Sequence, residues 1–377
     1  MTIKRALISG AGIAGAALAY WLTRDKWAVT VVEKATPDRS SGSPVDVRGR
    51  AVDIARAMGI EEHLRAADTG VDRAAFIDGD GKTRAVIRTR AHATGDKLAE
   101  FEVPRALLAA ALLDAVPAHV PIVSGDSITS LYQDGSGVDV EFERSPGDRF
   151  DVVFGADGLH STVRRLAFGP ETDYAHPFGL FIGTLRFPIE VEDPRQVLLF
   201  NEPNRLLAVH PAGGNPGAAF IFRSDDAYNH HDAAAGKAMV ESAYANSGWL
   251  APALLPAWRT AEDFYFDAVT RIEMCSWSRG RVALLGDAAS CLSLLGEGSS
   301  NAIVAAKTFA DALLRHEGNH ATAFTHYEHT HRARLRKYQR GARPMSHFLV
   351  PVTGYGITIR DWLIRTASLL AGRRAPN

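Results

Sequence analysis

The residues best suited to chemistry form a glycine-rich segment near the N-terminus. Gly10, Gly12 and Gly15 have the spacing GxGxxG, directly after a short apolar run at 5–9. In this pattern the first glycine permits a sharp turn, the second lets the backbone approach a pyrophosphate, and the third lets a helix pack closely on a sheet. Ile13 and Ala14 begin the expected helix, whose free N–H groups and positive dipole end attract phosphates. The segment therefore predicts dinucleotide binding, rather than a glycine turn without a ligand.

An acidic residue narrows the choice of dinucleotide. Glu33 ends the next apolar run, 28–33, and lies 21 residues after Gly12. A carboxylate at this place can accept hydrogen bonds from the hydroxyls of an adenosine ribose, and it repels a 2′-phosphate. The site should therefore hold FAD or NAD rather than NADP. The chain has no second GxGxxG, so a nicotinamide cofactor would have to bind without a Rossmann domain of its own.

Two further patterns combine an acid with glycine after an apolar run. Asp157 and Gly158 follow the run 151–156 and precede a helix start at Ser161. Gly286 and Asp287 follow the run 281–285, where the strands of an open α/β sheet end and ligand contacts gather. Taken alone, each pattern is also typical of an ordinary strand–turn–helix connection. Four small residues precede the long helix expected at 301–316 and would let a ligand lie against the backbone: Gly296, Gly298, Ser299 and Ser300.

The elements that would position these residues alternate between strand and helix. Strands at 5–9 and 28–33 flank a helix at 13–24, which is the arrangement of a βαβ crossover. Further helices are expected at 52–67 and 105–115, and a hairpin at 74–88 turns through Asp78-Gly79-Asp80-Gly81. The alternating run 138–143 should turn at 145–148 into the buried strand 151–156. The fold class is therefore α/β, with a Rossmann-like dinucleotide-binding domain and an inserted sheet-based domain between about 171 and 276.

Composition favours a small-molecule enzyme. The 377 residues carry a formal net charge of −1, so no global field would draw the protein to nucleic acid or to an anionic membrane. Cys275 and Cys291 show neither zinc-ligand nor disulfide spacing. His230-His231-Asp232 is interpreted as a solvated loop, because adjacent residues cannot easily chelate one ion. With no signal peptide and no run long enough to span a bilayer, the chain is expected to be cytoplasmic and without a metal.

In their order and separations, the three patterns resemble the p-hydroxybenzoate hydroxylase-like family of FAD-dependent monooxygenases, which carries an N-terminal GxGxxG, a central DG motif and a later GD motif. The resemblance implies that the glycine loop and Glu33 hold the ADP half of FAD. It implies that Arg105, in an Arg-x-x-Leu helix start, reaches the phosphate or ribityl region, and that Asp157 supports FAD and nicotinamide binding. Asp287 would bind the ribityl chain, and 296–300 would face the flavin ring. Further implied cofactor contacts are Lys34, Asp46, Arg48, Gly158, Arg164 and Gly286.

The family resemblance also implies a reaction. NADPH or NADH would reduce FAD, O2 would add to give a flavin C4a-hydroperoxide, and one oxygen would pass to an aromatic or polyketide-like substrate. The GD segment departs from the common family pattern, with Ser290, Leu294 and Glu297 where His, Pro and Gln are usual. This places the chain closer to the tetracycline-inactivating and antibiotic-tailoring branch. Three alternatives stay open: a flavin-dependent halogenase (whose Trp-x-Trp-x-Ile-Pro segment is not present), a flavoprotein reductase or dehydrogenase without oxygen transfer, and a non-catalytic flavin-binding protein.

The expected domain division follows the motifs. An FAD-binding domain would comprise 1–72, 98–170 and 277–326, a substrate-binding domain 73–97 and 171–276, and a C-terminal helical segment 327–377. The substrate should lie between the flavin and the inserted sheet, in a monomer or a homodimer. Four large apolar residues of that sheet are candidates for the pocket wall, with plain core packing as the alternative: Phe181, Leu185, Phe220 and Phe222.

Overall fold

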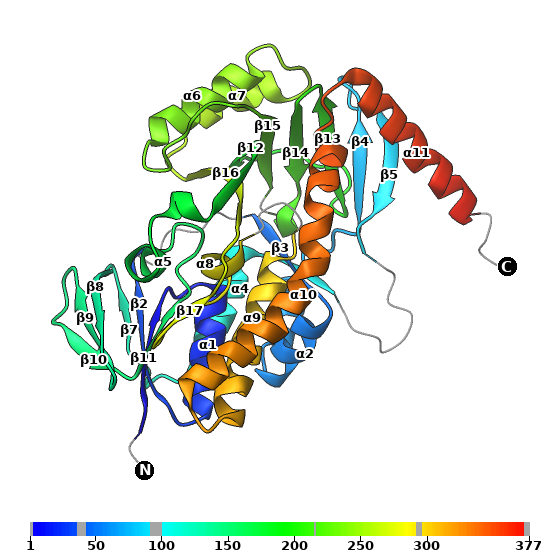
Figure 1. Cartoon of the computed structure of the whole chain (residues 1–377). Helices are drawn as coiled ribbons and strands as arrows, with labels where there is room; N and C mark the ends of the chain where they lie inside the picture. The colour runs from blue at the N-terminus through cyan, green and yellow to red at the C-terminus, as the bar shows by residue number, and fades with distance from the viewer. Residues whose placement is uncertain (1–2, 36–42, 91–99, 215, 292–295, 373–377) are drawn as a thin grey trace.

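A parallel sheet forms the lower part of the molecule in Figure 1. The computed structural model describes residues 3–35, 43–90, 100–214, 216–291 and 296–372. The sheet has the strand order β17-β18-β11-β1-β2-β7, and β17 alone runs antiparallel to its neighbour. Its strands are β1 (Arg5–Ser9), β2 (Ala28–Glu33), β7 (Ile122–Ser124), β11 (Val152–Gly155), β17 (Ser278–Arg279) and β18 (Val282–Leu284). Because helices cover the sheet, its central strands are apolar without alternation.

The βαβ unit predicted from the sequence is confirmed in its bounds. Helix α1 (Ile13–Arg24) joins β1 to β2 and packs against the long helix α9 (Gly298–Arg315). Helices α4 (Arg105–Asp114), α5 (Thr162–Ala167), α8 (Asp287–Ser290) and α10 (His320–Leu349) complete this part. Beside them lies a two-stranded sheet of β3 (Pro44–Val47) and β6 (Phe101–Pro104). All three cofactor motifs therefore stand at the ends of neighbouring strands.

Three local predictions need correction. The single helix expected at 52–67 is two helices, α2 (Arg50–Ala57) and α3 (Glu61–Ala66), because Gly59 adopts a φ of +79° that ends the first one. The run 138–143 does not turn directly into the buried strand. Instead, β8 (Ile128–Gln133), β9 (Val138–Phe142) and β10 (Asp148–Phe150) form a separate antiparallel sheet. The long helix expected from 301 begins at Gly298, so it includes both serines of the GD segment.

A seven-stranded sheet forms the upper part of the molecule, in the order β16-β12-β15-β14-β13-β4-β5. The predicted hairpin is β4 (Arg73–Ile77) and β5 (Thr83–Arg88), and β4 pairs in parallel with β13. The other strands are β12 (Ala175–Arg186), β13 (Gln196–Glu202), β14 (Arg205–His210), β15 (Gly217–Arg223) and β16 (Phe264–Ile272). Short 3-10 helices lie at Glu171–Asp173 and Ala212–Gly214. Figure 1 shows α6 (Ala233–Tyr244) and α7 (Ala251–Thr260) above the sheet, with α11 (Gly354–Gly372) beside β5.

The four predicted pocket residues are core residues, and this expectation is wrong. Phe181, Leu185, Phe220 and Phe222 are at most 5% exposed and pack in one cluster with Trp258 of α7. Strand alternation explains the error, because it places all four side chains on the face that α6 and α7 cover. The residues adjacent to them in sequence, such as Ala219, lie on the opposite face of the sheet.

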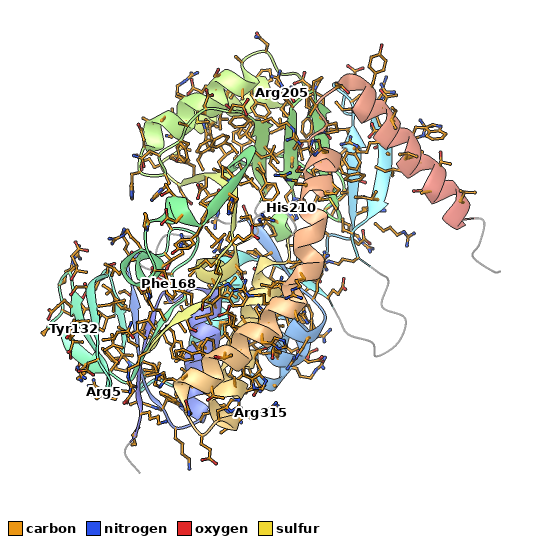
Figure 2. The ribbon with its side chains drawn as sticks, in the orientation of Figure 1. Arg5, Tyr132, Phe168, Arg205, His210 and Arg315 are labelled. Atoms are coloured by element: carbon orange, nitrogen blue, oxygen red, sulfur yellow. The ribbon has the colours of Figure 1, made fainter. Side chains whose placement is uncertain are left out.

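Part of that opposite face turns toward the parallel sheet, whereas another part packs against Val350 and Ile364 of the C-terminal region. His210 of β14 lies between the upper and the lower part of the molecule (Figure 2), where its Nε2 is 2.8 Å from Glu102 Oε1 of β6. Ala208 and Ala219 pair across β14 and β15 on the same face as His210, and both are partly exposed. This part of the face therefore carries small side chains that are only partly covered.

Two substitutions at adjacent positions test this assignment of faces. Phe220→Ala should lower the free energy of unfolding by about 3–5 kcal/mol, because it leaves a cavity in the core beneath α6 and α7. Ala219→Trp should leave stability close to wild type, because the side chain at 219 is partly exposed on the opposite face. Urea denaturation of both variants distinguishes them. Equal destabilisation by the two substitutions would mean that the faces are assigned wrongly.

Candidate active site

The glycine loop has the geometry that a pyrophosphate site requires. Gly10 has a φ of +101°, and a Cβ there would lie 2.5 Å from the carbonyl oxygen of Ala156. A Cβ on Gly15 would lie 1.9 Å from the Gly10 carbonyl oxygen, so only glycine lets α1 approach β1 this closely. At Gly12 a Cβ would meet no atom within 4 Å. The tight contacts belong to the fold, and the open space at Gly12 is left for a ligand.

The start of α1 and the end of β2 complete this part of the site. Gly12 is the N-cap of α1, and no side chain caps the helix, so first-turn N–H groups such as those of Ile13 and Ala14 can bind phosphate oxygens. Glu33 accepts hydrogen bonds from the backbone N–H of Ala11 and of Ala35, both at 2.7 Å. Each carboxylate oxygen keeps further acceptor capacity for a ribose hydroxyl. These features fit the ADP half of FAD.

The DG motif holds the end of β1 against the start of α5. Asp157 accepts hydrogen bonds from Ser161 Oγ at 2.5 Å, from Val163 N at 3.1 Å and from Ser9 Oγ at 3.4 Å. These bonds join the first turn of α5 to the end of β1. Burial raises the pKa of Asp157, and the bond from Ser161 opposes this shift. Gly158, with a φ of +82°, lines the same cleft as Gly10 and Gly12.

Arg164, predicted as a cofactor contact, is a structural residue here. Its side chain is fully buried and donates to the carbonyl oxygens of Leu159 at 2.5 Å and Ala288 at 3.0 Å, and to Glu171 Oε2 at 2.7 Å. Nη1 and Nη2 thus join the DG segment to the GD helix α8, whereas the buried Nε has no hydrogen-bond partner among the described residues. Arg164 therefore positions the two motifs against each other.

The GD motif packs directly on the glycine loop. Gly286 has a φ of +62°, and a Cβ there would lie 2.9 Å from the Ala14 Cβ. Asp287 begins α8 at the end of β18, and its partial burial raises the pKa of its carboxyl, while the positive charge of Arg105 opposes this shift. Arg105 is the first residue of α4, as predicted, and lines the cleft. The two predicted ribityl and phosphate contacts thus lie close enough to interact.

The segment expected to face the flavin ring meets β3. Ser300 Oγ donates to the Asp46 carbonyl oxygen at 3.0 Å and accepts from Arg48 N at 2.9 Å. Its side chain is fully buried in this bridge, so Ser300 positions β3 instead of facing a ligand, and Ser299 is buried too. A Cβ on Gly296 would lie 3.0 Å from Asp46 Oδ2. The structure thus brings Asp46 and Arg48 together with the GD segment.

The carboxyl of Asp46 at this contact has a raised pKa. Burial raises its pKa to about 6, although Arg48 Nη2, 2.9 Å from Asp46 Oδ1, opposes the shift. Glu297 is the N-cap of α9, and Gly298 begins it. Leu294, part of the departure from the family pattern, lies outside the described residues.

One cleft of about 1150 Å³ runs past the glycine loop and the DG motif. Its first end is formed by Gly10, Gly12, Glu33 and Lys34, and Asp157 and Arg105 line its middle. Its second end was not recognised in the sequence, apart from the exposed loop at 230–232. That end is lined by residues from the DG segment, the 3-10 helix and the loop before α6: His160, Thr162, Arg165, Glu171, Tyr228, Asn229, His230 and His231. The nearest sequence signal was the place of His160, two residues after Gly158.

Comparison with known proteins agrees with this geometry. Residues 4–342 match the family described as FAD binding domain. A flavin-dependent monooxygenase of Legionella longbeachae serogroup 1 (strain NSW150) is 34% identical, over 85% of this chain and 83% of that protein. An FAD-dependent monooxygenase of Sarocladium schorii is 28% identical, over 97% of this chain and 93% of that protein.

Solved structures give the same result. The crystal structure of tetracycline destructase Tet(51) superposes with a TM-score of 0.83 at 29% identity, over the whole of both chains. Tetracycline destructase Tet(55) gives a TM-score of 0.80 at 30% identity, over 97% of this chain and 95% of that chain. The chain therefore belongs to the FAD-binding domain family, among its FAD-dependent monooxygenases.

Proposed function

We propose that this protein uses NADPH or NADH and O2 to hydroxylate an aromatic or polyketide-like small molecule. The observation that carries the proposal is the convergence of the glycine loop and the DG motif on one cleft, with the GD motif packed directly on the glycine loop. FAD, when bound, supplies the redox chemistry: it accepts electrons from the nicotinamide and transfers one atom of O2 to the substrate. The protein then has to bind and orient the cofactors and the substrate, and to exclude water.

The proposed roles of the cofactor residues follow their positions. Gly10 to Gly15 and Glu33 hold the ADP half of FAD, and Lys34 and Gly158 border it. Arg105 and Asp287 hold the phosphate and ribityl part. Asp46, Arg48 and Gly296 lie toward the flavin ring. Because Asp46 has a pKa of about 6, its carboxyl is partly protonated near pH 6 and can donate as well as accept a hydrogen bond.

We place the nicotinamide cofactor at the second end of the cleft. A volume of about 1150 Å³ exceeds the roughly 300–1,000 Å³ of an ordinary small-ligand pocket, which supports the binding of two molecules. The second end offers the cation of Arg165 and the exposed rings of His230 and His231. The proposal agrees with the sequence, which has no second GxGxxG.

We place the substrate on the sheet face that carries Ala208, Ala219 and Tyr265. Small side chains there suit a flat ring system, and Tyr265 provides a polar group. Burial, and next the charge of Asp267, raise the pKa of Tyr265, so its phenol stays protonated and donates to Asp267 Oδ2 at 3.4 Å. The charges of Arg105 and Asp287 also act on this phenol, which supports its placement on the cofactor side.

Other features of the protein remain proposals. The division into 1–72, 98–170 and 277–326 against 73–97 and 171–276 is supported by the sheets, since β4 and β5 join strands from 175–272. The free thiol of Cys275 suits a cytoplasmic location. Among the described helices, none is both long and apolar enough to cross a bilayer. A monomer or a homodimer is proposed for the solution state.

The test is incorporation of labelled oxygen. The FAD-loaded protein is incubated with NADPH, ¹⁸O₂ and a panel of probes, namely tetracycline, a naphthol and a hydroxyanthraquinone, and the products are analysed by mass spectrometry. One ¹⁸O atom should appear in at least one probe, and Ala219→Trp should abolish that product while FAD stays bound. NADPH oxidation that labels none of the probes would favour a flavoprotein reductase instead.

A further inference from the structure

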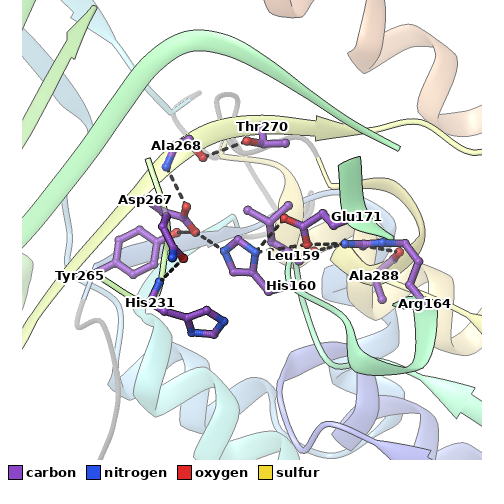
Figure 3. Close-up of polar contacts among 11 residues, drawn as sticks. Leu159, His160, Arg164, Glu171, His231, Tyr265, Asp267, Ala268, Thr270 and Ala288 are labelled. Atoms are coloured by element: carbon purple, nitrogen blue, oxygen red, sulfur yellow. Dashed lines mark hydrogen bonds and ion pairs between the residues drawn. The ribbon is translucent and has the colours of Figure 1, made fainter. Parts of the chain in front are cut away.

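His160 lies in a polar network that joins the two sheets (Figure 3). Its ring nitrogens contact two carboxylates: Nδ1 is 3.0 Å from Glu171 Oε1, and Nε2 is 2.9 Å from Asp267 Oδ2. Asp267 belongs to β16 and is 6% exposed, whereas His160 follows the DG motif. The two residues are 107 positions apart in the chain. The contact therefore fixes the seven-stranded sheet to the cofactor motifs.

The two contacts define the protonation state of the ring. An ionised carboxylate only accepts hydrogen bonds, so both ring nitrogens must donate, and the ring is an imidazolium. Burial lowers the proton affinity of His160, but the hydrogen bonds to Asp267 and Glu171 outweigh it and raise the pKa to about 9. Burial likewise raises the pKa of Glu171, yet the bond from His160 reverses this shift and the net direction is down.

The network continues from Glu171 to the GD motif. Glu171 also accepts from Arg164, which donates to the Ala288 carbonyl oxygen of α8. An unbroken path of hydrogen bonds therefore connects α8 with Glu171, His160 and β16. Two cations and two carboxylates are present, so the cluster is electrically balanced, as a partly buried ionic network must be.

A second contact comes from the loop before α6. The His230 ring stacks on the His160 ring with centroids 3.6 Å apart and planes 8° from parallel. Burial and the charge of His160 lower the pKa of His230, so the stacked ring stays neutral at pH 7. The groups that face His160 are Glu171 and Arg164 from its own side, Asp267 and Tyr265 from β16, and Tyr228, His230 and His231 from the loop.

We propose that His160 is a positioning residue whose doubly held ring sets the seven-stranded sheet, and with it the Tyr265 phenol, at its working distance from the cofactor motifs. Tyr265 contacts the same Asp267 carboxylate that His160 holds. Loss of the imidazolium would leave Asp267 buried without its cation, and β16 would move. The expected effect on turnover rests on the proposed function, whereas the effect on the sheet does not.

The pH dependence has a definite sign. Because the pKa of His160 is raised to about 9 in the folded protein, the stabilisation is fully present below the ordinary histidine pKa of about 6.5. It declines as the pH rises from there and is lost above about 9. Protonation of Glu171 would break the network only in acid, since its pKa is lowered.

The experiment compares His160→Gln with His176→Gln in the FAD-loaded protein. His176 of β12 is the matched control, because it also faces a carboxylate, that of Glu273 directly after β16, but at the surface: Nε2 lies 4.0 Å from Glu273 Oε2. Hydrogen exchange at pH 7 should be about tenfold faster in 264–272 and 228–232 of His160→Gln, and unchanged in β1 and β11. For a probe that wild type turns over, the KM of His160→Gln for that probe should be about tenfold higher, and its kcat should stay within about threefold of wild type. His176→Gln should match wild type throughout.

A second measurement keeps the proposal falsifiable if His160→Gln folds poorly. In Asp267→Asn, NMR titration of the labelled histidine rings should show the His160 pKa well below its wild-type value of about 9. Unchanged exchange in His160→Gln would overturn the proposal. So would a raised KM without faster exchange, because His160 would then act by touching a ligand. If no probe is turned over by wild type, the proposed function fails while the exchange data still decide the role of His160.

Discussion

Replacing Gly12 with alanine should give a folded protein that no longer holds FAD well. The new methyl group meets no protein atom within 4 Å, and the residue has a φ of −71° that alanine adopts freely. The methyl would instead occupy the space where the backbone approaches the pyrophosphate. We expect FAD affinity to fall about 100-fold, which corresponds to about 2.7 kcal/mol.

Gly15→Ala is the matched comparison. Its methyl would lie 1.9 Å from the Gly10 carbonyl oxygen, so α1 must move away from β1, at a cost of about 1–3 kcal/mol or more. This variant should therefore lose both FAD affinity and stability, whereas Gly12→Ala loses only affinity. Titration with FAD and urea denaturation of the apoprotein separate the two effects. Wild-type FAD affinity in Gly12→Ala would show that the pyrophosphate does not bind there.

The second large effect is expected at Arg164. Arg164→Met should lower the free energy of unfolding by about 3–5 kcal/mol, because removing one cation leaves this partly buried network with two carboxylates and only one positive charge. The carbonyl oxygens of Leu159 and Ala288 would lose this donor, and Glu171 would keep only the contact with His160. The DG and GD motifs would then be held less firmly.

Arg165→Met is the control for this prediction, since Arg165 is adjacent in sequence but exposed. It should change stability by less than about 0.5 kcal/mol. Urea denaturation of both variants gives the comparison. If Arg164→Met were as stable as Arg165→Met, the guanidinium would not be the joint between the motifs.

Local patterns were enough to predict the parallel part of the fold. The bounds of β1, α1 and β2 follow from apolar runs buried on both faces and from a glycine loop whose spacing has one structural meaning. The same reasoning failed at Gly59, where a single left-handed residue divides one helix pattern into two. It also failed for Phe220 and its neighbours, because alternation tells which residues share a face but not which face the helices cover.

The site was predictable where a motif fixes the backbone, and not where side chains meet across long distances in sequence. Gly10, Gly15 and Asp157 lie where the motifs placed them. Arg164 and Ser300 stand within motifs, but their side chains make internal contacts that the sequence does not reveal. The pairing of His160 with Asp267 depends on how two sheets approach each other, and no local pattern encodes it.

The most direct test of the central claim is the absorbance spectrum of the purified protein after addition of FAD, followed by anaerobic addition of NADPH. We expect a yellow protein with the bands of bound oxidised flavin, bleached by NADPH and restored by air. A protein that stays colourless after incubation with FAD and removal of the unbound flavin would contradict the assignment of the cleft as an FAD site.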